Sequence, residues 1–111
     1  MDIANCYILR FVHVISRKAL TVFALRHPAA RAPLEVWYRL VSKSGFDSFV
    51  QIKQVFNSAD YVAPYIVFDV GGNNFRVVTV IHFDRQRLYV RDVLTHAGYD
   101  RWTQAHRSKK S

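Results

Sequence analysis

The stretch YIVFDVGGNNFRVVTVIHFDRQRLYVRDVLTH, residues 65–96, decides the fold of this chain. It is rich in valine, isoleucine, phenylalanine and tyrosine, the residue types favoured in β-strands, and two turn signals interrupt it. The glycines of GGNN can supply the positive φ angles of a tight hairpin, and DRQ marks a second turn. The stretch therefore predicts three antiparallel strands near residues 65–70, 75–83 and 87–94.

The part of the chain before this stretch predicts one strand and three helices. ILRFVHVIS, residues 8–16, mixes β-branched and aromatic residues, which is typical of a strand. Ser16 is expected to cap a helix over residues 17–27, and Asp47 a short helix over residues 47–56. Between these two, residues 27–45 predict a helix with one buried face, formed by Leu34, Trp37, Tyr38 and Val41.

The order of these elements predicts an α+β fold. An N-terminal strand and helices are followed by a three-stranded antiparallel meander and a short C-terminal helix, for which Thr95 is the expected N-cap. We expect the strand near residues 11–16 to join the other three in a twisted antiparallel sheet, with the helices on one face.

Composition indicates one folded, strongly basic domain. The 111 residues suit a single domain, and half of them are hydrophobic, which is enough for a core. Sixteen Lys and Arg face eight Asp and Glu, which gives a formal charge of +8. Such an excess indicates an anionic partner, with nucleic acid favoured over an acidic protein or an anionic membrane surface.

Cysteine usage and hydropathy bear on the compartment. Cys6 is the single cysteine, so an intrachain disulfide and a multi-cysteine metal site are excluded, which fits a reducing cytoplasm. No apolar run approaches the length of a transmembrane helix. Asp2 stands where an export signal needs a positive charge, and Arg10 interrupts the apolar run that such a signal needs. We therefore expect a cytoplasmic protein without a membrane partner.

Several motif-like features do not indicate a cofactor or a metal. VGGNNF lacks the Lys-Ser/Thr of a phosphate-binding P-loop and joins two strands. The scattered acids are interpreted as turn and ion-pair residues, since a metal-dependent nuclease needs converging carboxylates; they are Asp69, Asp84, Asp92 and Asp100. The spacing of metal ligands is also missing among His13, His27 and His82.

The residues that could carry chemistry lie in and after the last two strands. Arg76 and Arg91 interrupt apolar strands, where a charge is costly unless it reaches solvent at the sheet edge or a phosphate. His96 follows the last strand, and on a helix Tyr99 and Asp100 share its face. Metal-free RNA cleavage needs such groups for proton transfer and phosphate stabilisation. Spacing alone leaves open that His96 is an ordinary residue at a helix start.

Four motifs, spread from about Val12 to the C-terminus, carry a family resemblance. VHVISRKAL is similar to an opening strand and helix, and HPAARAPLEVWYRLV to a helix that starts with His-Pro and carries Trp-Tyr. VFDVGGNNFRVV looks like a Val-Phe-Asn-x-Gly-Gly-Asn hairpin with its Arg, and LYVRDVLTHAGYD like a Tyr-x-Arg-x-Val-x-Thr-His-x-x-Tyr-Asp signature. Together they resemble the HigB toxins of bacterial type II toxin–antitoxin modules, in the RelE-like superfamily.

The resemblance implies a function as well as a fold. HigB toxins are small basic endoribonucleases that cut mRNA on the translating ribosome, use no metal or other cofactor, and are held inactive by HigA, a helix-turn-helix antitoxin. Arg76, Arg91, His96 and Tyr99 fall on the matching motif positions. The resemblance assigns the arginines to the phosphate, His96 to proton transfer, and Tyr99 to base stacking or proton transfer. Asp100 would orient His96 or cap the local structure.

The chain departs from the family pattern at two places, and two functional classes remain as alternatives to an endoribonuclease. Residues 1–11 precede the resemblance and are expected to be a dispensable extension of a single domain over residues 12–111. Asp69 stands where the family usually has asparagine, and YVAPY before it lacks a basic residue often found there. The other classes are a non-enzymatic basic RNA-binding module and a protein-interaction module.

Overall fold

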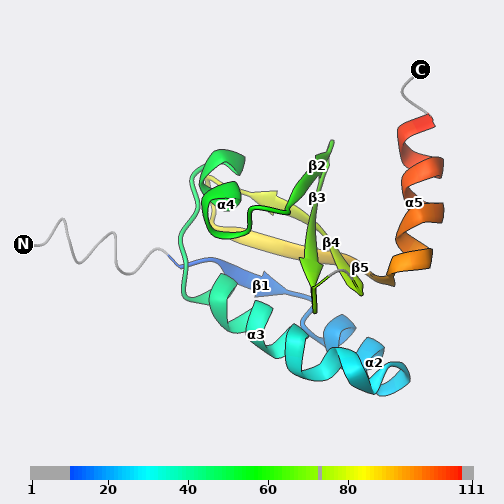
Figure 1. The fold of residues 1–111 in the computed structure, drawn as a ribbon. Coiled ribbons are helices and arrows are strands. Elements are labelled where there is room, and N and C mark those ends of the chain that lie inside the picture. Colours follow the sequence, from blue (N-terminus) through cyan, green and yellow to red (C-terminus); the bar gives the residue numbers. More distant parts are fainter. Residues whose placement is uncertain (1–10, 73, 109–111) are drawn as a thin grey trace, which may run out of the picture.

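The computed structural model describes residues 11–72 and 74–108, which form a single α+β unit (Figure 1). The elements follow in the order β1 (His13–Ile15), α2 (Lys18–Arg26), a 3-10 turn (Pro28–Ala30), α3 (Arg31–Ser42), α4 (Phe49–Val55), β2 (Asp60–Val62), β3 (Tyr65–Val70), β4 (Phe75–His82), β5 (Arg87–Thr95) and α5 (His96–Ser108). The predicted α+β class and the three predicted C-terminal strands are confirmed. The extension predicted for residues 1–11 lies outside the described residues except for Phe11.

The sheet has five strands in the order β1-β5-β4-β3-β2, so the predicted strand count was too small. The missed strand, β2, has only three residues, which is too short for a recognisable alternation, and it pairs antiparallel with β3. The prediction of an all-antiparallel sheet is also wrong, because β1 runs parallel to β5. The connection from β1 to β5 runs through the three helices and through β2, β3 and β4, which is long enough for a parallel pairing, and no pattern in β1 itself specifies its direction.

The β3–β4 hairpin has the turn that the glycines predicted. Gly71 and Gly72 take φ angles of 65° and 68°, where a side chain is strained. The hairpin pairs Val70 with Phe75 and then Asp69 with Arg76. A carboxylate and a guanidinium therefore become direct cross-strand neighbours, close to where the hairpin turns.

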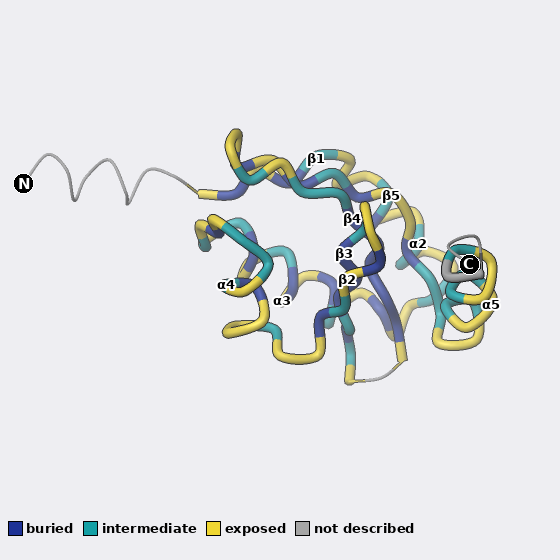
Figure 2. Tube along the Cα trace, turned by 90° about the horizontal axis from the view of Figure 1, so that it is seen from above, coloured by how far each residue is buried: buried dark blue, intermediate teal, exposed yellow. Residues whose placement is uncertain are grey.

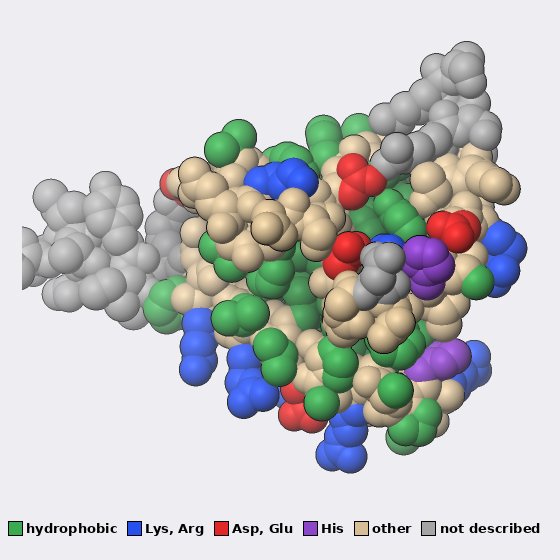
Figure 3. Space-filling view, viewed as in Figure 1, with side chains coloured by type: hydrophobic (Ala, Val, Ile, Leu, Met, Phe, Trp, Pro, Cys, Tyr) green, Lys and Arg blue, Asp and Glu red, His purple; other side chains and the backbone are tan. Residues whose placement is uncertain are grey.

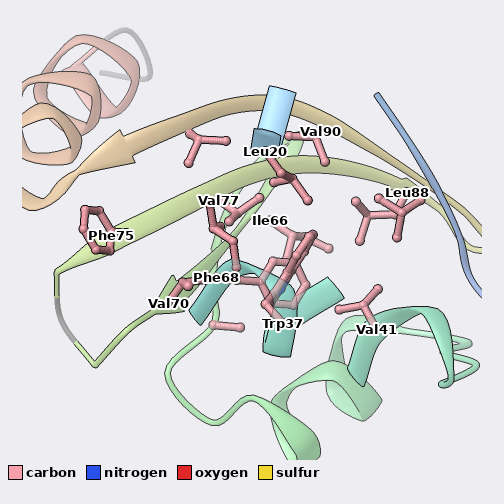
Figure 4. Packing of buried hydrophobic residues seen from close by; sticks show 14 of the residues in the cluster. Leu20, Trp37, Val41, Ile66, Phe68, Val70, Phe75, Val77, Leu88 and Val90 are labelled. Atoms are coloured by element: carbon pink, nitrogen blue, oxygen red, sulfur yellow. The ribbon is translucent and has the colours of Figure 1, made fainter. Parts of the chain in front are cut away.

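The main core lies between the sheet and the three helices α2, α3 and α4 (Figure 4). Phe68 of β3 is fully buried at its centre, with ring centroids 5.3 Å from Trp37 and 5.1 Å from Phe56. Buried positions follow the strands, and exposed positions gather at the loops and the outer sides of the helices (Figure 2). Of the buried face predicted for α3, Leu34, Trp37 and Val41 are buried as expected, whereas Tyr38 is only partly buried.

A second, smaller set of buried side chains lies on the opposite face of the sheet. Val67 and Val78 are paired across β3 and β4, are each 1% exposed, and do not belong to the main core. Tyr65 points to the same face as Val67 because side chains alternate along a strand, and its ring lies 5.3 Å from that of Trp102 in α5. The prediction that all helices cover one face is therefore wrong for α5, which stands apart from the other helices (Figure 1).

Helix α5 is also not short, since its 13 residues make it the longest helix in the described part of the chain. Its sequence is mostly polar and shows no aliphatic stripe, so the prediction did not reach its full length. The predicted cap is confirmed, because Oγ1 of Thr95 accepts a hydrogen bond from the Gly98 N–H at 3.1 Å.

The two other predicted caps are wrong. Ser16 has a φ angle of 72° and lies outside α2, whose N-cap position is Arg17. For α4 the N-cap position is Ser48 rather than Asp47. In both cases the N-cap position lies one residue after the polar residue that was predicted to occupy it. Neither of the two observed N-cap side chains forms a capping hydrogen bond.

Replacing Phe68 should test the main core. Phe68→Ala is expected to lower the free energy of unfolding by about 3–5 kcal/mol, because it removes a fully buried ring and leaves a cavity. Val50→Ala, at a position that is 65% exposed, should change it by less than about 0.5 kcal/mol. Urea unfolding midpoints measure both effects. Equal midpoints for the two variants would contradict the packing described.

Candidate active site

Three of the predicted site residues, His96, Tyr99 and Asp100, gather around Arg76, near the turn end of the β3–β4 hairpin and the start of α5 (Figure 1). Arg76 is only 5% exposed, although it was expected to reach solvent at the sheet edge or to point from an open sheet face at a phosphate. It points to the opposite face from the main core, because its strand neighbours Phe75 and Val77 belong to that core. A guanidinium keeps its charge at all ordinary pH values, so this position requires partners.

The guanidinium of Arg76 is held by three elements of structure. Its Nε lies 2.9 Å from Oδ1 of Asp69, and its Nη1 donates to the carbonyl oxygen of Phe75 at 3.2 Å. Its Nη2 lies 3.3 Å from Nδ1 of His96. A guanidinium can only donate, so Nδ1 of His96 must be the acceptor. The hydrogen of the neutral imidazole is then on Nε2.

The main chain places His96 for this contact. His96 is the first residue of α5, and its backbone N–H donates to the carbonyl oxygen of Asn74 at 2.9 Å. Thr95 caps the helix immediately before it. The start of α5 is thus tied to the hairpin turn and to its own cap, which fixes the point from which the imidazole extends.

Tyr99 joins the cluster from the next turn of α5. The Cζ atom of Arg76 lies over its ring, 5.1 Å from the centroid, which is a cation–π distance. Its hydroxyl donates to Oδ2 of Asp60 in β2 at 3.2 Å. The short strand that sequence reasoning missed therefore supplies a partner of a predicted site residue.

Asp100 lies close to His96 on the exposed side of the cluster. Its Oδ2 is 3.8 Å from Nε2 of His96, and the two side chains are 65% and 53% exposed. An exposed pair at this distance contributes little to stability. His96, Tyr99 and Asp100 therefore lie on the same face of α5, as their spacing predicted.

A series of stacked rings continues from Tyr99 along α5. Trp102 stacks on Tyr99 at 5.8 Å and on His106 at 4.0 Å, and both Trp102 and His106 meet Tyr65 of β3 edge-on. These contacts hold α5 against the sheet and so keep Tyr99 over Arg76. Sequence reasoning missed them, although the spacing of Tyr99, Trp102 and His106 at three and four residues is a helix-face signal.

Arg91 and His82 lie outside the cluster. Arg91 is exposed, and its Cζ lies 5.5 Å from the ring centroid of Tyr89 on the same strand. Within the described residues it forms no hydrogen bond or ion pair with Arg76, His96 or Tyr99. His82 ends β4, six residues from Arg76, which corresponds to about 20 Å along a strand.

A large hollow of the described surface lies elsewhere. It has a volume of about 760 Å³, runs between α2 and α3, and contains none of the predicted site residues. Arginines and apolar side chains line it together, among them Arg17, Arg31, Arg39 and Leu25. The space-filling view shows basic and hydrophobic side chains side by side over these helices, and acidic, basic and histidine side chains together near the start of α5 (Figure 3).

Two further features concern the described residues 11–72 and 74–108. They contain no group of three or more histidine, cysteine, aspartate or glutamate side chains that could hold a metal ion. Their helices are all too short or too polar to cross a membrane.

Comparison with known proteins agrees with the sequence motifs. Residues 30–102 match the family model of the HigB toxin, described as the RelE-like toxic component of a toxin–antitoxin system. The mRNA interferase toxin HigB of Escherichia coli strain K12 is 38% identical over 101 residues, which cover 88% of this chain and 97% of that protein. The mRNA interferase HigB of Shigella flexneri gives the same values, and that of Escherichia coli O6:H1 is 31% identical over 102 residues, 89% of this chain and 99% of its own length.

The matched region includes every residue of the cluster around Arg76 as well as Arg91. A match over most of the chain, with the predicted motifs inside it, establishes that the chain belongs to the HigB toxin family, the RelE-like toxic components of toxin–antitoxin systems.

Proposed function

We propose that this protein is the toxin of a type II toxin–antitoxin module and acts as an endoribonuclease that cleaves mRNA. The observation that carries the proposal is the placement of His96 against a buried arginine, Arg76, at 3.3 Å within a chain of the HigB family. Relatives in this family bear the name mRNA interferase. The cluster combines a group that can transfer a proton with a fixed positive charge.

The proposed reaction is attack of a ribose 2′-hydroxyl on the adjacent phosphate. The 2′ oxygen forms a bond to phosphorus, the bond from phosphorus to the 5′ oxygen breaks, and a 2′,3′-cyclic phosphate and a 5′-hydroxyl result. One proton leaves the 2′-hydroxyl, and one reaches the 5′ oxygen. Groups that move these protons and stabilise the charge on the phosphate are sufficient for catalysis of this step.

His96 is assigned to proton transfer, through Nε2. Its Nδ1 faces the buried Arg76, so Nε2 is the ring nitrogen on the half-exposed side, where RNA can approach. Imidazole is suited to this role because its ordinary titration lies near neutral pH. Asp100 is assigned to orienting the imidazole from the Nε2 side.

Arg76 and Arg91 are assigned to the RNA phosphates in different ways. Arg76 supplies a fixed charge beside His96, and Tyr99 keeps the guanidinium in place through its ring. Arg91 is exposed on the adjacent strand and is assigned to a phosphate of the flanking RNA. Tyr99 already contacts a cation and an indole, so a base that stacks on it would compete with these contacts.

The proposed setting is the cytoplasm, on the translating ribosome. A net charge of +8 favours approach to ribosome-bound RNA, where phosphate density is high. The proposed inhibitor is a HigA-like helix-turn-helix antitoxin. The alternative classes, a non-enzymatic RNA-binding module and a protein-interaction module, explain the charge but give no use to a half-exposed histidine beside a buried arginine.

Substitution of His96 tests the enzymatic proposal. His96→Gln is expected to reduce cleavage of ribosome-bound mRNA by about 10²- to 10⁴-fold, because a positioned proton-transfer group is lost. The matched control His82→Gln should cleave at the wild-type rate, since His82 lies at the far end of β4. EDTA should leave the wild-type rate unchanged. Binding of RNA without cleavage by the wild-type protein would favour the non-enzymatic class instead.

A second prediction concerns the antitoxin. Co-expression with a HigA-like protein encoded beside the toxin should abolish the growth arrest. The rate of association of the purified pair should fall steeply between 0.1 M and 1 M salt, because electrostatic steering by the +8 charge is screened. Stopped-flow mixing measures that rate. A purified complex that cleaves mRNA as fast as the free toxin would contradict direct neutralisation.

A further inference from the structure

Asp69 has no assigned role in the reaction, yet its carboxylate contacts the guanidinium of Arg76 directly. The two residues are direct cross-strand partners in the β3–β4 hairpin. Oδ1 of Asp69 lies 2.9 Å from Nε of Arg76, and the side chains are 23% and 6% exposed. A largely buried charge pair of this kind holds its partners in one geometry more firmly than a surface pair does.

The planar shape of the guanidinium turns this contact into an orientation constraint. Asp69 fixes Nε, and the carbonyl oxygen of Phe75 fixes Nη1. Because the group is rigid and flat, these two contacts also place Nη2. Nη2 is the nitrogen that reaches Nδ1 of His96 at 3.3 Å.

We propose that Asp69 is a positioning residue of the active site: it holds Arg76 in the orientation that donates to Nδ1 of His96, and so sets which imidazole nitrogen carries the hydrogen. The inference rests on the proposed function of His96. Asp69 itself acts only through Arg76. Neutral His96 then meets the RNA with its hydrogen on Nε2, as a hydrogen-bond donor to a phosphate oxygen. Transfer of that proton to the leaving 5′ oxygen requires a proton from solvent to be taken up on Nδ1, since neutral imidazole would otherwise become an imidazolate.

This tautomer distinguishes two roles that a histidine can have in the reaction, which are to accept the 2′-hydroxyl proton and to donate a hydrogen. With Nδ1 occupied by a donor, the free enzyme offers no imidazole lone pair to the 2′-hydroxyl. Neutral His96 is therefore placed on the side of the reaction that donates hydrogen, and the first acceptor of the 2′-hydroxyl proton is another group. A merely structural role for Asp69 would leave the tautomer of His96 unchanged.

The test combines a spectroscopic readout with kinetics. ¹⁵N NMR of labelled protein shows which ring nitrogen of His96 carries the hydrogen, and cleavage assays on ribosome-bound mRNA give kcat and KM. The wild type should carry the hydrogen on Nε2. Asp69→Ala should spread it over both nitrogens and lower kcat about 10²-fold, the scale expected for a misplaced catalytic group, with a smaller change in KM.

Two further variants complete the comparison. Asp69→Asn should rescue the tautomer and most of kcat, because the amide oxygen can accept the same hydrogen bond from Nε. Asp84→Ala removes the same charge at an exposed turn position and should change neither readout. The proposal is overturned if Asp69→Ala keeps the wild-type tautomer and kcat, or if the wild type carries the hydrogen on Nδ1.

Loss of folding in Asp69→Ala would not end the test. Arg76→Lys keeps a cation for Asp69 but lacks the second nitrogen that reaches His96, so it should change the tautomer where Asp69→Asn does not. Identical tautomers in these two variants would overturn the proposal. His96→Gln, assayed in parallel, distinguishes the two possible failures. If His96→Gln cleaves like the wild type, the proposed role of His96 is wrong. If His96→Gln is inactive while Asp69→Ala keeps the wild-type tautomer and kcat, only the role of Asp69 is wrong.

Discussion

A buried positive charge, that of Arg76, is the constraint around which the second face of this sheet is organised. An arginine that is 5% exposed would destabilise the fold unless its donors found acceptors. The hairpin register supplies Asp69, the strand supplies the carbonyl oxygen of Phe75, and α5 supplies His96 and the ring of Tyr99. His96, one of the groups that satisfy this charge, is also the group to which proton transfer is assigned, so we expect the stability and the activity of this region to be linked.

One face of the sheet carries the main hydrophobic core, and the other carries the proposed site. The main core, centred on Phe68, anchors the sheet to α2, α3 and α4 and contains none of the proposed site residues. The opposite face has a small apolar layer around Val67 and Val78, and α5 is attached there through rings such as Trp102 rather than through an aliphatic stripe. A helix held in this way places polar site residues next to a sheet without burying all of them.

Much of this arrangement could be predicted from the sequence. The strand stretch, the glycine turn and the cap at Thr95 are local signals, and the motif around His96 placed it at the start of the last helix, beside the strand that carries Arg76. Asp69 was predictable in principle, because a hairpin that pairs residues 70 and 75 also pairs residues 69 and 76. The short strand β2, the direction of β1 and the place of α5 depend on tertiary contacts that no local pattern encodes.

The most direct test of the account is a crystal structure of the protein with a short RNA whose scissile nucleotide lacks the 2′-hydroxyl, so that it binds but cannot be cut. We expect an oxygen of the phosphate 3′ to the deoxyribose to lie about 3 Å from Nε2 of His96, with Arg76 still paired to Asp69. An RNA strand bound along the hollow between α2 and α3, with no phosphate near His96, would contradict it.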